Sequence, residues 1–285
     1  MPRTARKAPG GIIFHVLNRG VGRRGIFEND EDYAAFERVM AHALTAVPVK
    51  LLAYCLMSNH WHLMVCPQED RQLGRFMQRL TMTHTRRWQE HYRQVGFGHL
   101  YQGRFKSFPV QDDGHFLVLA RYVERNALRA GLVQRAEEWR WSSLWRRVGR
   151  GGEVHRVPMP LAIWPVERPM DWLAWVNEPQ RQAELDALRE SVRKGKPYGD
   201  EKWRQSTTRT LGLESSHRPT GPPKKVSKLG REKRTCPAFR PGESAPVPLS
   251  DPRFPTPTRG KRTRPAFRPR PAFRPCPAFR PRIWW

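Results

Sequence analysis

Apolar and polar positions between residue 11 and about residue 146 follow the periodicities of a mixed α+β domain. Short apolar runs bounded by turn residues predict strands over residues 12–17, 49–54, 61–66 and 105–110. Apolar residues at helical spacing predict helices over about residues 31–43 and 71–92 and from residue 112 to Gly131. This order of elements is typical of a ferredoxin-like antiparallel sheet with flanking helices, and the last helix is appended to it.

Polar residues indicate where two of these helices begin. Asn29 and Asp30 can cap the first helix, and Asp112 and Asp113 can cap the last one. Pro109, near the end of the fourth strand, favours an edge position in the sheet because proline cannot donate a ladder hydrogen bond.

The pattern changes after residue 150. Three tryptophans and a helical pattern over residues 181–193 predict a small helical extension, which either packs against the first domain or acts as a separate DNA-binding module. From His217 onward the chain holds sixteen of the 27 prolines, eighteen Lys or Arg against three Asp or Glu, and four copies of Pro-Ala-Phe-Arg-Pro. Such a segment is expected to be disordered, or to act as a loose nucleic-acid tether. We therefore divide the chain into a first domain, an extension and a tail, at residues 1–150, 151–216 and 217–285.

Charge and composition narrow the classes of partner. The formal net charge is +26, from 52 Lys and Arg against 26 Asp and Glu, which favours nucleic acid, although acidic proteins or anionic membranes could absorb the same charge. No apolar run approaches the roughly 20 residues of a membrane span, and the basic N-terminus leads into no signal-peptide core. The four cysteines form no C-x-x-C pair. We expect a soluble, cytoplasmic, nucleoid-associated protein without a membrane partner.

Two histidines in the third strand are candidates for metal binding. Side chains alternate along a strand, so His60 and His62 point to the same face while Trp61 packs on the other. Two imidazoles placed in this way can share one cation, which could polarise a phosphoryl oxygen. Ordinary surface or hydrogen-bonded histidines are the competing interpretation.

The last helix carries a second candidate pair. Tyr122 and Asn126 lie four residues apart, offset from the apolar stripe of Phe116, Leu119 and Val123, so both are expected to face a cleft. A phenol is a weak nucleophile unless a cation or a metal-bound phosphate lies beside it. Asn126 could donate to a phosphate or lend its oxygen to a metal. The alternative is a half-buried helix tyrosine without a chemical role.

Four runs of sequence closely resemble the REP-associated tyrosine transposases, which belong to the single-tyrosine HUH endonucleases of the wider IS200-like transposase superfamily. They occur in the order of the family, all within residues 11–146, and cover residues 14–20, 54–65, 101–107 and 121–133. Residues 188–199 and 211–213 also look like the C-terminal extension of some members. The Pro-Ala-Phe-Arg-Pro repeats match no part of this pattern.

The resemblance implies a metal-dependent DNA endonuclease and strand transferase. His60 and His62 would bind Mg²⁺ or Mn²⁺, with Asn126 as a polar third ligand, and Tyr122 would attack a phosphate of single-stranded DNA. The products would be a 5′-phosphotyrosine and a free 3′-hydroxyl, which can reverse the reaction. Family substrates are palindromic repeats that fold into hairpins. The enzyme would act as a monomer or a homodimer, since in some relatives the tyrosine helix serves the partner's metal site.

Charge and placement within the matching runs suggest that Gln102, Arg104 and Lys106 contact DNA near the site. The competing interpretation is that these three residues belong to a solvated loop. The full expected set consists of Arg19, Gln102, Arg104, Lys106, Arg121 and Arg129.

Three other functions were weighed. A catalytically silent, domesticated protein that binds DNA hairpins would keep the fold without requiring a metal. An RNA-binding module of the RRM type has the same order of elements, but the aromatic signature of its central strands is missing. Replication initiators and relaxases share the histidine motif, yet the run around Tyr122 fits them poorly.

Overall fold

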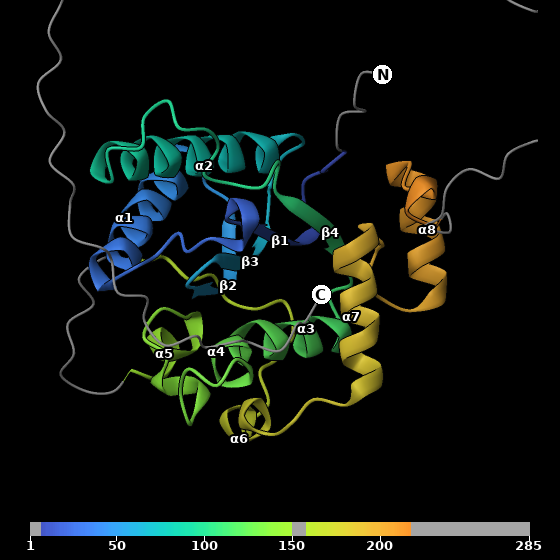
Figure 1. Cartoon of the computed structure of the whole chain (residues 1–285). Helices are drawn as coiled ribbons and strands as arrows, with labels where there is room; N and C mark the ends of the chain where they lie inside the picture. Colours follow the sequence, from blue (N-terminus) through green and yellow to red (C-terminus); the bar gives the residue numbers. More distant parts are fainter. Residues whose placement is uncertain (1–6, 150–157, 218–285) are drawn as a thin grey trace, which may run out of the picture. The chain divides into compact units, whose positions relative to one another are not determined.

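The computed structural model describes residues 7–149 and 158–217. Its four strands form one antiparallel sheet in the order β2-β3-β1-β4 (Figure 1). The strands are β1 (Ile13–Arg19), β2 (Lys50–Met57), β3 (His60–Cys66) and β4 (Lys106–Val110). This order confirms the predicted ferredoxin-like α+β fold, and β4, which contains Pro109, lies at an edge of the sheet.

Two helices, α1 (Asp30–Ala46) and α2 (Gln72–His91), cover one face of the sheet (Figure 1). The core beneath them contains the buried side chains of Phe36, Trp61 and Leu63. Asn29 is the residue that caps α1, because its side chain accepts a hydrogen bond from the backbone of Asp32 while the Asp32 carboxylate accepts from the backbone of Asn29.

The opposite face is covered by α3 (Gly114–Glu124), α4 (Asn126–Arg129) and α5 (Ser143–Val148) (Figure 1). Asp113 caps α3 by accepting a hydrogen bond from the backbone of His115, whereas Asp112 makes no such cap. The helix predicted to run on to Gly131 is instead divided at Arg125, whose ψ of −2° departs from helical geometry. Short 3-10 helices occupy Val21–Arg23, Ala136–Glu138 and Glu214–His217.

The described part of the extension packs against the sheet and helices of residues 7–149 instead of standing apart from them. It contains α6 (Trp172–Asn177), α7 (Gln182–Lys194) and α8 (Glu201–Leu211). The indole of Trp164 donates to the backbone oxygen of Leu52 at 2.8 Å, and a backbone hydrogen bond joins Tyr198 to Pro109 at the edge strand. The tail predicted over residues 217–285 lies outside the described residues except for His217. Among those residues, no helix is both long and apolar enough to cross a membrane.

A buried carboxylate on α3 links the two parts of the chain. Glu124 is fully buried and accepts hydrogen bonds from the Ser143 hydroxyl at 2.7 Å and from the Trp172 indole at 2.9 Å. Burial raises the pKa of this carboxyl above its ordinary value, and both hydrogen bonds oppose the rise. The carboxylate therefore depends on its two donors for stability.

Replacing Trp172 with Phe is expected to lower the free energy of unfolding by about 1–3 kcal/mol, because one oxygen of Glu124 loses its donor while it stays buried. Trp175→Phe is the matched control on the same helix, since no hydrogen bond joins the Trp175 indole to the described residues. This control should lower the free energy of unfolding by less than Trp172→Phe does. Urea unfolding of both variants measures the difference. Equal losses would show that the hydrogen bond to Glu124 contributes nothing.

Candidate active site

The two histidines of β3 point to the face of the sheet that α3 and α4 cover. His62 is fully buried, His60 is half-buried, and their ring centroids are 5.0 Å apart. Trp61, between them, points to the other face, where its indole donates to the Tyr101 hydroxyl at 3.1 Å. Strand alternation therefore brings both imidazoles to one place beneath the helix that carries Tyr122.

Cross-strand pairing adds two basic residues to the same face. His60 pairs with Arg19, while His62 pairs with Leu17, which in turn pairs with Lys106 on β4. Because directly paired residues point to the same side of a sheet, Arg19 and Lys106 flank the histidines. The Arg19 guanidinium donates to the side-chain oxygen of Gln102, which holds that residue at the same end of the sheet.

Both histidines are held in the neutral form. Burial, together with the positive charges of Arg129 and Arg19, lowers the pKa of His60 to about 4. Burial also holds the pKa of His62 well below its ordinary value, with contributions from the neighbouring His60, His15 and Arg129. A neutral imidazole is the form that binds metal ions.

Tyr122 lies against His62. Its ring meets the ring of His62 edge-on at a centroid distance of 5.9 Å, and the Arg129 guanidinium lies over the tyrosine ring at 4.0 Å. Tyr122 is only 4% exposed and belongs to the same apolar cluster as Phe116 and Val123. The expectation that Tyr122 is offset from the apolar stripe of α3 is therefore wrong. The sheet covers one side of α3 and the extension covers the other, so side chains on both sides are buried.

Several buried polar atoms around Tyr122 have no partner among the described residues. These atoms are His62 Nε2, Asn126 Nδ2 and Arg129 Nη1. The Asn126 oxygen, by contrast, accepts a hydrogen bond from Arg129 Nη2 at 2.9 Å. A buried polar group without a partner costs about 1–3 kcal/mol, so three of them beside one tyrosine indicate a place where a polar ligand binds.

The donor set fits a divalent cation in part. Among residues 7–149 and 158–217, no group of three or more His, Cys, Asp or Glu side chains is arranged to hold a metal ion. His60 and His62 supply neutral imidazoles, and His62 Nε2 is available. Asn126 could serve as a third ligand only if its side-chain oxygen gave up the hydrogen bond from Arg129 and bound the ion instead.

A third histidine, His15 on β1, completes the cluster and was not found from the sequence. Its Nε2 lies 2.9 Å from His62 Nδ1, and the two rings stack at a centroid distance of 5.1 Å. His15 also contacts the ring of Phe108. The matching run over residues 14–20 contained this residue, but its proximity to His62 depends on the register between β1 and β3, which a single sequence does not reveal.

The expected DNA-contacting residues divide into three groups. Arg19, Gln102, Lys106 and Arg129 lie around the histidines and Tyr122, whereas Arg104 is exposed and lines a groove at α2.

The third group consists of Arg121 alone, whose buried position is unfavourable for the predicted contact with DNA. Its side chain is buried and donates to the backbone oxygens of Glu178 and Pro179 at 2.8 and 3.1 Å. Its guanidinium also lies over the Trp175 ring. Arg121 therefore attaches the extension to α3.

Comparison with known proteins agrees with a DNA-processing site. Residues 10–126 match a family model described as "Transposase IS200 like". The matched part of the chain, which contains His15, His60, His62 and Tyr122, is similar to the IS200-like transposases. The match confirms the resemblance noted from the sequence. A search of curated proteins finds no match.

Two solved structures are also similar to the chain. A REP-associated tyrosine transposase bound to a REP hairpin is 16% identical, with a TM-score of 0.40, and the match covers 57% of this chain and 98% of that one. A protein from Deinococcus radiodurans R1, described as a candidate transposase, is 16% identical with a TM-score of 0.31, over 44% of this chain and 94% of that one. These scores are too low to support a conclusion about function.

Proposed function

We propose that this protein is a metal-dependent endonuclease and strand transferase that cleaves and rejoins single-stranded DNA at hairpin-forming palindromic repeats. The observation that carries the proposal is the position of Tyr122, in ring contact with His62 and Arg129 and beside three unpartnered buried polar atoms. These groups all lie within one chain.

Tyr122 is the proposed nucleophile. Its phenol oxygen attacks a backbone phosphorus, a P–O bond to tyrosine forms, and the bond from phosphorus to the 3′ oxygen breaks. The phenol proton leaves to solvent, and the departing 3′ oxygen takes up a proton from solvent to become a hydroxyl. Attack by that hydroxyl, or by one from another strand, reverses the step, so one covalent intermediate serves both cleavage and rejoining.

Basic side chains around Tyr122 would stabilise the charges of this reaction. Arg129 has a buried N–H without a partner beside the tyrosine ring, so it can donate to a phosphate oxygen. Arg19 and Lys106 flank the histidines and can hold the neighbouring backbone phosphates. His60, His62 and Asn126 would hold Mg²⁺ or Mn²⁺, which when bound polarises the phosphate and offsets charge in the transition state.

His15 is proposed to fix the orientation and tautomer of His62. When His62 Nδ1–H donates to His15 Nε2, the lone pair of His62 Nε2 remains for a metal ion. His15→Phe keeps a ring of similar size but removes the acceptor, so Mn²⁺ affinity should fall by about 10–100-fold. His15→Gln, which retains an acceptor, should restore part of it.

Isothermal titration with Mn²⁺ measures this effect without requiring cleavage. His84→Phe is a matched control, because His84 is also buried but lies on the other face, hydrogen-bonded to Tyr101. Unchanged Mn²⁺ affinity in His15→Phe would refute the positioning role.

The proposed function is tested by incubating the purified protein with single-stranded hairpin repeats, with Mn²⁺ or with EDTA. The expected result is a denaturant-resistant protein–DNA adduct that requires the metal. Tight binding without an adduct across several repeats would instead support a catalytically silent hairpin-binding protein. One observation favours that alternative, namely that Arg129 already occupies the Asn126 oxygen.

A further inference from the structure

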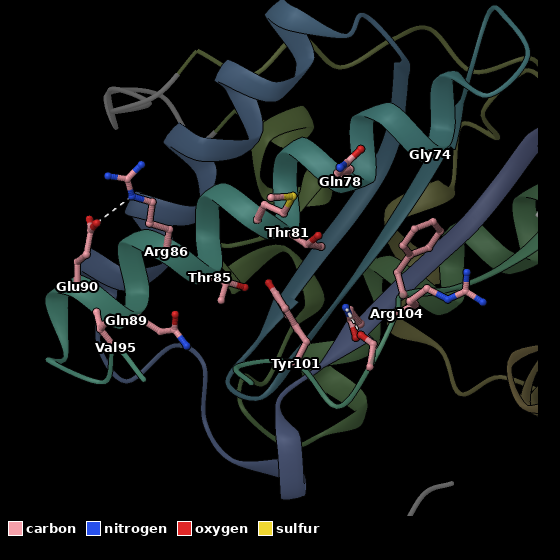
Figure 2. Close-up of a pocket in the computed structure, with 14 residues that line it drawn as sticks. Gly74, Gln78, Thr81, Thr85, Arg86, Gln89, Glu90, Val95, Tyr101 and Arg104 are labelled. Carbon is pink, nitrogen blue, oxygen red and sulfur yellow. Dashed lines mark hydrogen bonds and ion pairs between the residues drawn. The ribbon is translucent and has the colours of Figure 1, made fainter. Parts of the chain in front are cut away.

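A groove of about 650 Å³ runs along α2, on the face of the sheet away from Tyr122 (Figure 2). Its α2 wall extends from Gly74 to Glu90, which corresponds to roughly 24 Å at the rise of an α-helix. Tyr101 and Arg104 line the opposite wall, and Figure 2 shows Tyr101 pointing toward α2. None of these residues entered the proposed reaction, and only Arg104 was among the DNA contacts expected from the sequence.

The α2 wall offers both polar and apolar contacts. Gln78, Thr81, Thr85 and Gln89 recur at spacings of three and four residues and therefore share one side of the helix. The Gln78 amide and the Thr85 hydroxyl make no hydrogen bond to another described residue. Met82 is 62% exposed in the same wall. Amide groups can hydrogen-bond the edges of nucleobases, while apolar side chains can contact their faces.

The charge of the groove is suited to a polyanion. Its one carboxylate, Glu90, is paired with Arg86 at 2.9 Å. Arg104 is exposed and has no salt-bridge partner among the described residues. The lining therefore presents one unpaired positive charge and no unpaired negative charge.

Two short segments of chain line the groove on one face of the sheet and the proposed active site on the other. Asn18 lines the groove, while its neighbour Arg19 faces the histidines on the other side of β1. Tyr101, Gly103 and Arg104 line the groove, and Gln102 between them bonds to Arg19.

We propose that this groove binds unpaired nucleotides that flank the hairpin stem, after they pass around the end of the sheet at Arg19 and Gln102. The inference rests on the proposed function and adds a second site for the same DNA. Arg104 contacts the backbone, and Gln78 and Thr85 contact base edges. A peptide segment is less suitable, because Arg104 in the groove and Arg19 next to Asn18 both offer positive charge to phosphates.

Gly74 allows the groove to be altered without disturbing the fold. A Cβ atom added at this position meets no heavy atom within 4 Å, and an acidic residue is favourable in the first turn of a helix. Gly74→Glu therefore adds bulk and a negative charge to the groove. Arg79→Gln is the matched control, because it changes the net charge by the same amount on the same helix but outside the groove.

The experiment compares a hairpin of fixed stem with the same hairpin carrying an unpaired extension of randomised bases. Fluorescence anisotropy is recorded in EDTA with the Tyr122→Phe protein, so that cleavage plays no part. We expect the extension to tighten binding about tenfold. Gly74→Glu should remove most of this gain, Gln78→Ala should reduce it about threefold, and Arg79→Gln should preserve it.

The outcomes separate the two proposals. If neither hairpin binds, the proposed function fails and the inference fails with it. If both hairpins bind equally well, or if Gly74→Glu and Gln78→Ala keep the full gain, hairpin recognition stands but the groove does not bind the flank.

Discussion

Tyr122→Phe is expected to abolish the covalent protein–DNA adduct, with a loss of at least about a thousandfold, while hairpin affinity stays within about twofold. Phenylalanine keeps the ring that packs against His62 and beneath Arg129, so the site should retain its shape. Only the attacking oxygen is removed. The measurement is denaturing gel electrophoresis of labelled hairpin DNA after incubation with Mn²⁺, together with anisotropy for binding.

Tyr198→Phe is the control for this loss, because it removes a phenol at the other end of α3, beside His115. It should form the adduct at the rate of the unaltered protein. An adduct of normal yield in Tyr122→Phe would show that another group is the nucleophile.

His60→Ala is expected to reduce metal-dependent cleavage by about 100–1000-fold, because one of two imidazole ligands is lost. His60 is the better choice for this test because it is half-buried, whereas His62 is fully buried and its removal would leave a cavity beside His15. The measurement is the initial rate of cleavage across a series of Mn²⁺ concentrations.

His115→Ala serves as the control, since His115 lies at the start of α3, hydrogen-bonded to Asp113. It should cleave at the normal rate. Cleavage by His60→Ala at the normal rate and with the normal Mn²⁺ dependence would contradict the assignment of His60 as a ligand.

The local periodicity of the sequence predicted the order of strands and helices and the shared face of His60 and His62. Alternation along a strand is a property of the chain itself, so it can be seen in one sequence. Register between strands cannot be seen in one sequence, because it depends on contacts formed only in the fold. For this reason the position of His15 beside His62, and of Arg19 and Lys106 on the same face, became visible only in the structure.

The environment of α3 could not be predicted either. Tyr122 and Arg121 seemed available on the pattern of one helix, but the extension covers the side of α3 that faces away from the sheet. Arg121 thereby gained backbone acceptors at residues 178 and 179, and Glu124 gained the indole of Trp172. These contacts join segments about 50 residues apart, and nothing in the local pattern specifies them.

Mass spectrometry of the adduct tests the central claim most directly. After nuclease treatment of the covalent complex, trypsin should release the short peptide of residues 122–125, because Arg121 precedes Tyr122 and Arg125 follows. We predict that this peptide carries a nucleotide attached through its 5′ phosphate to the tyrosine oxygen. A nucleotide attached to any other residue, or through a 3′ phosphate, would contradict the account.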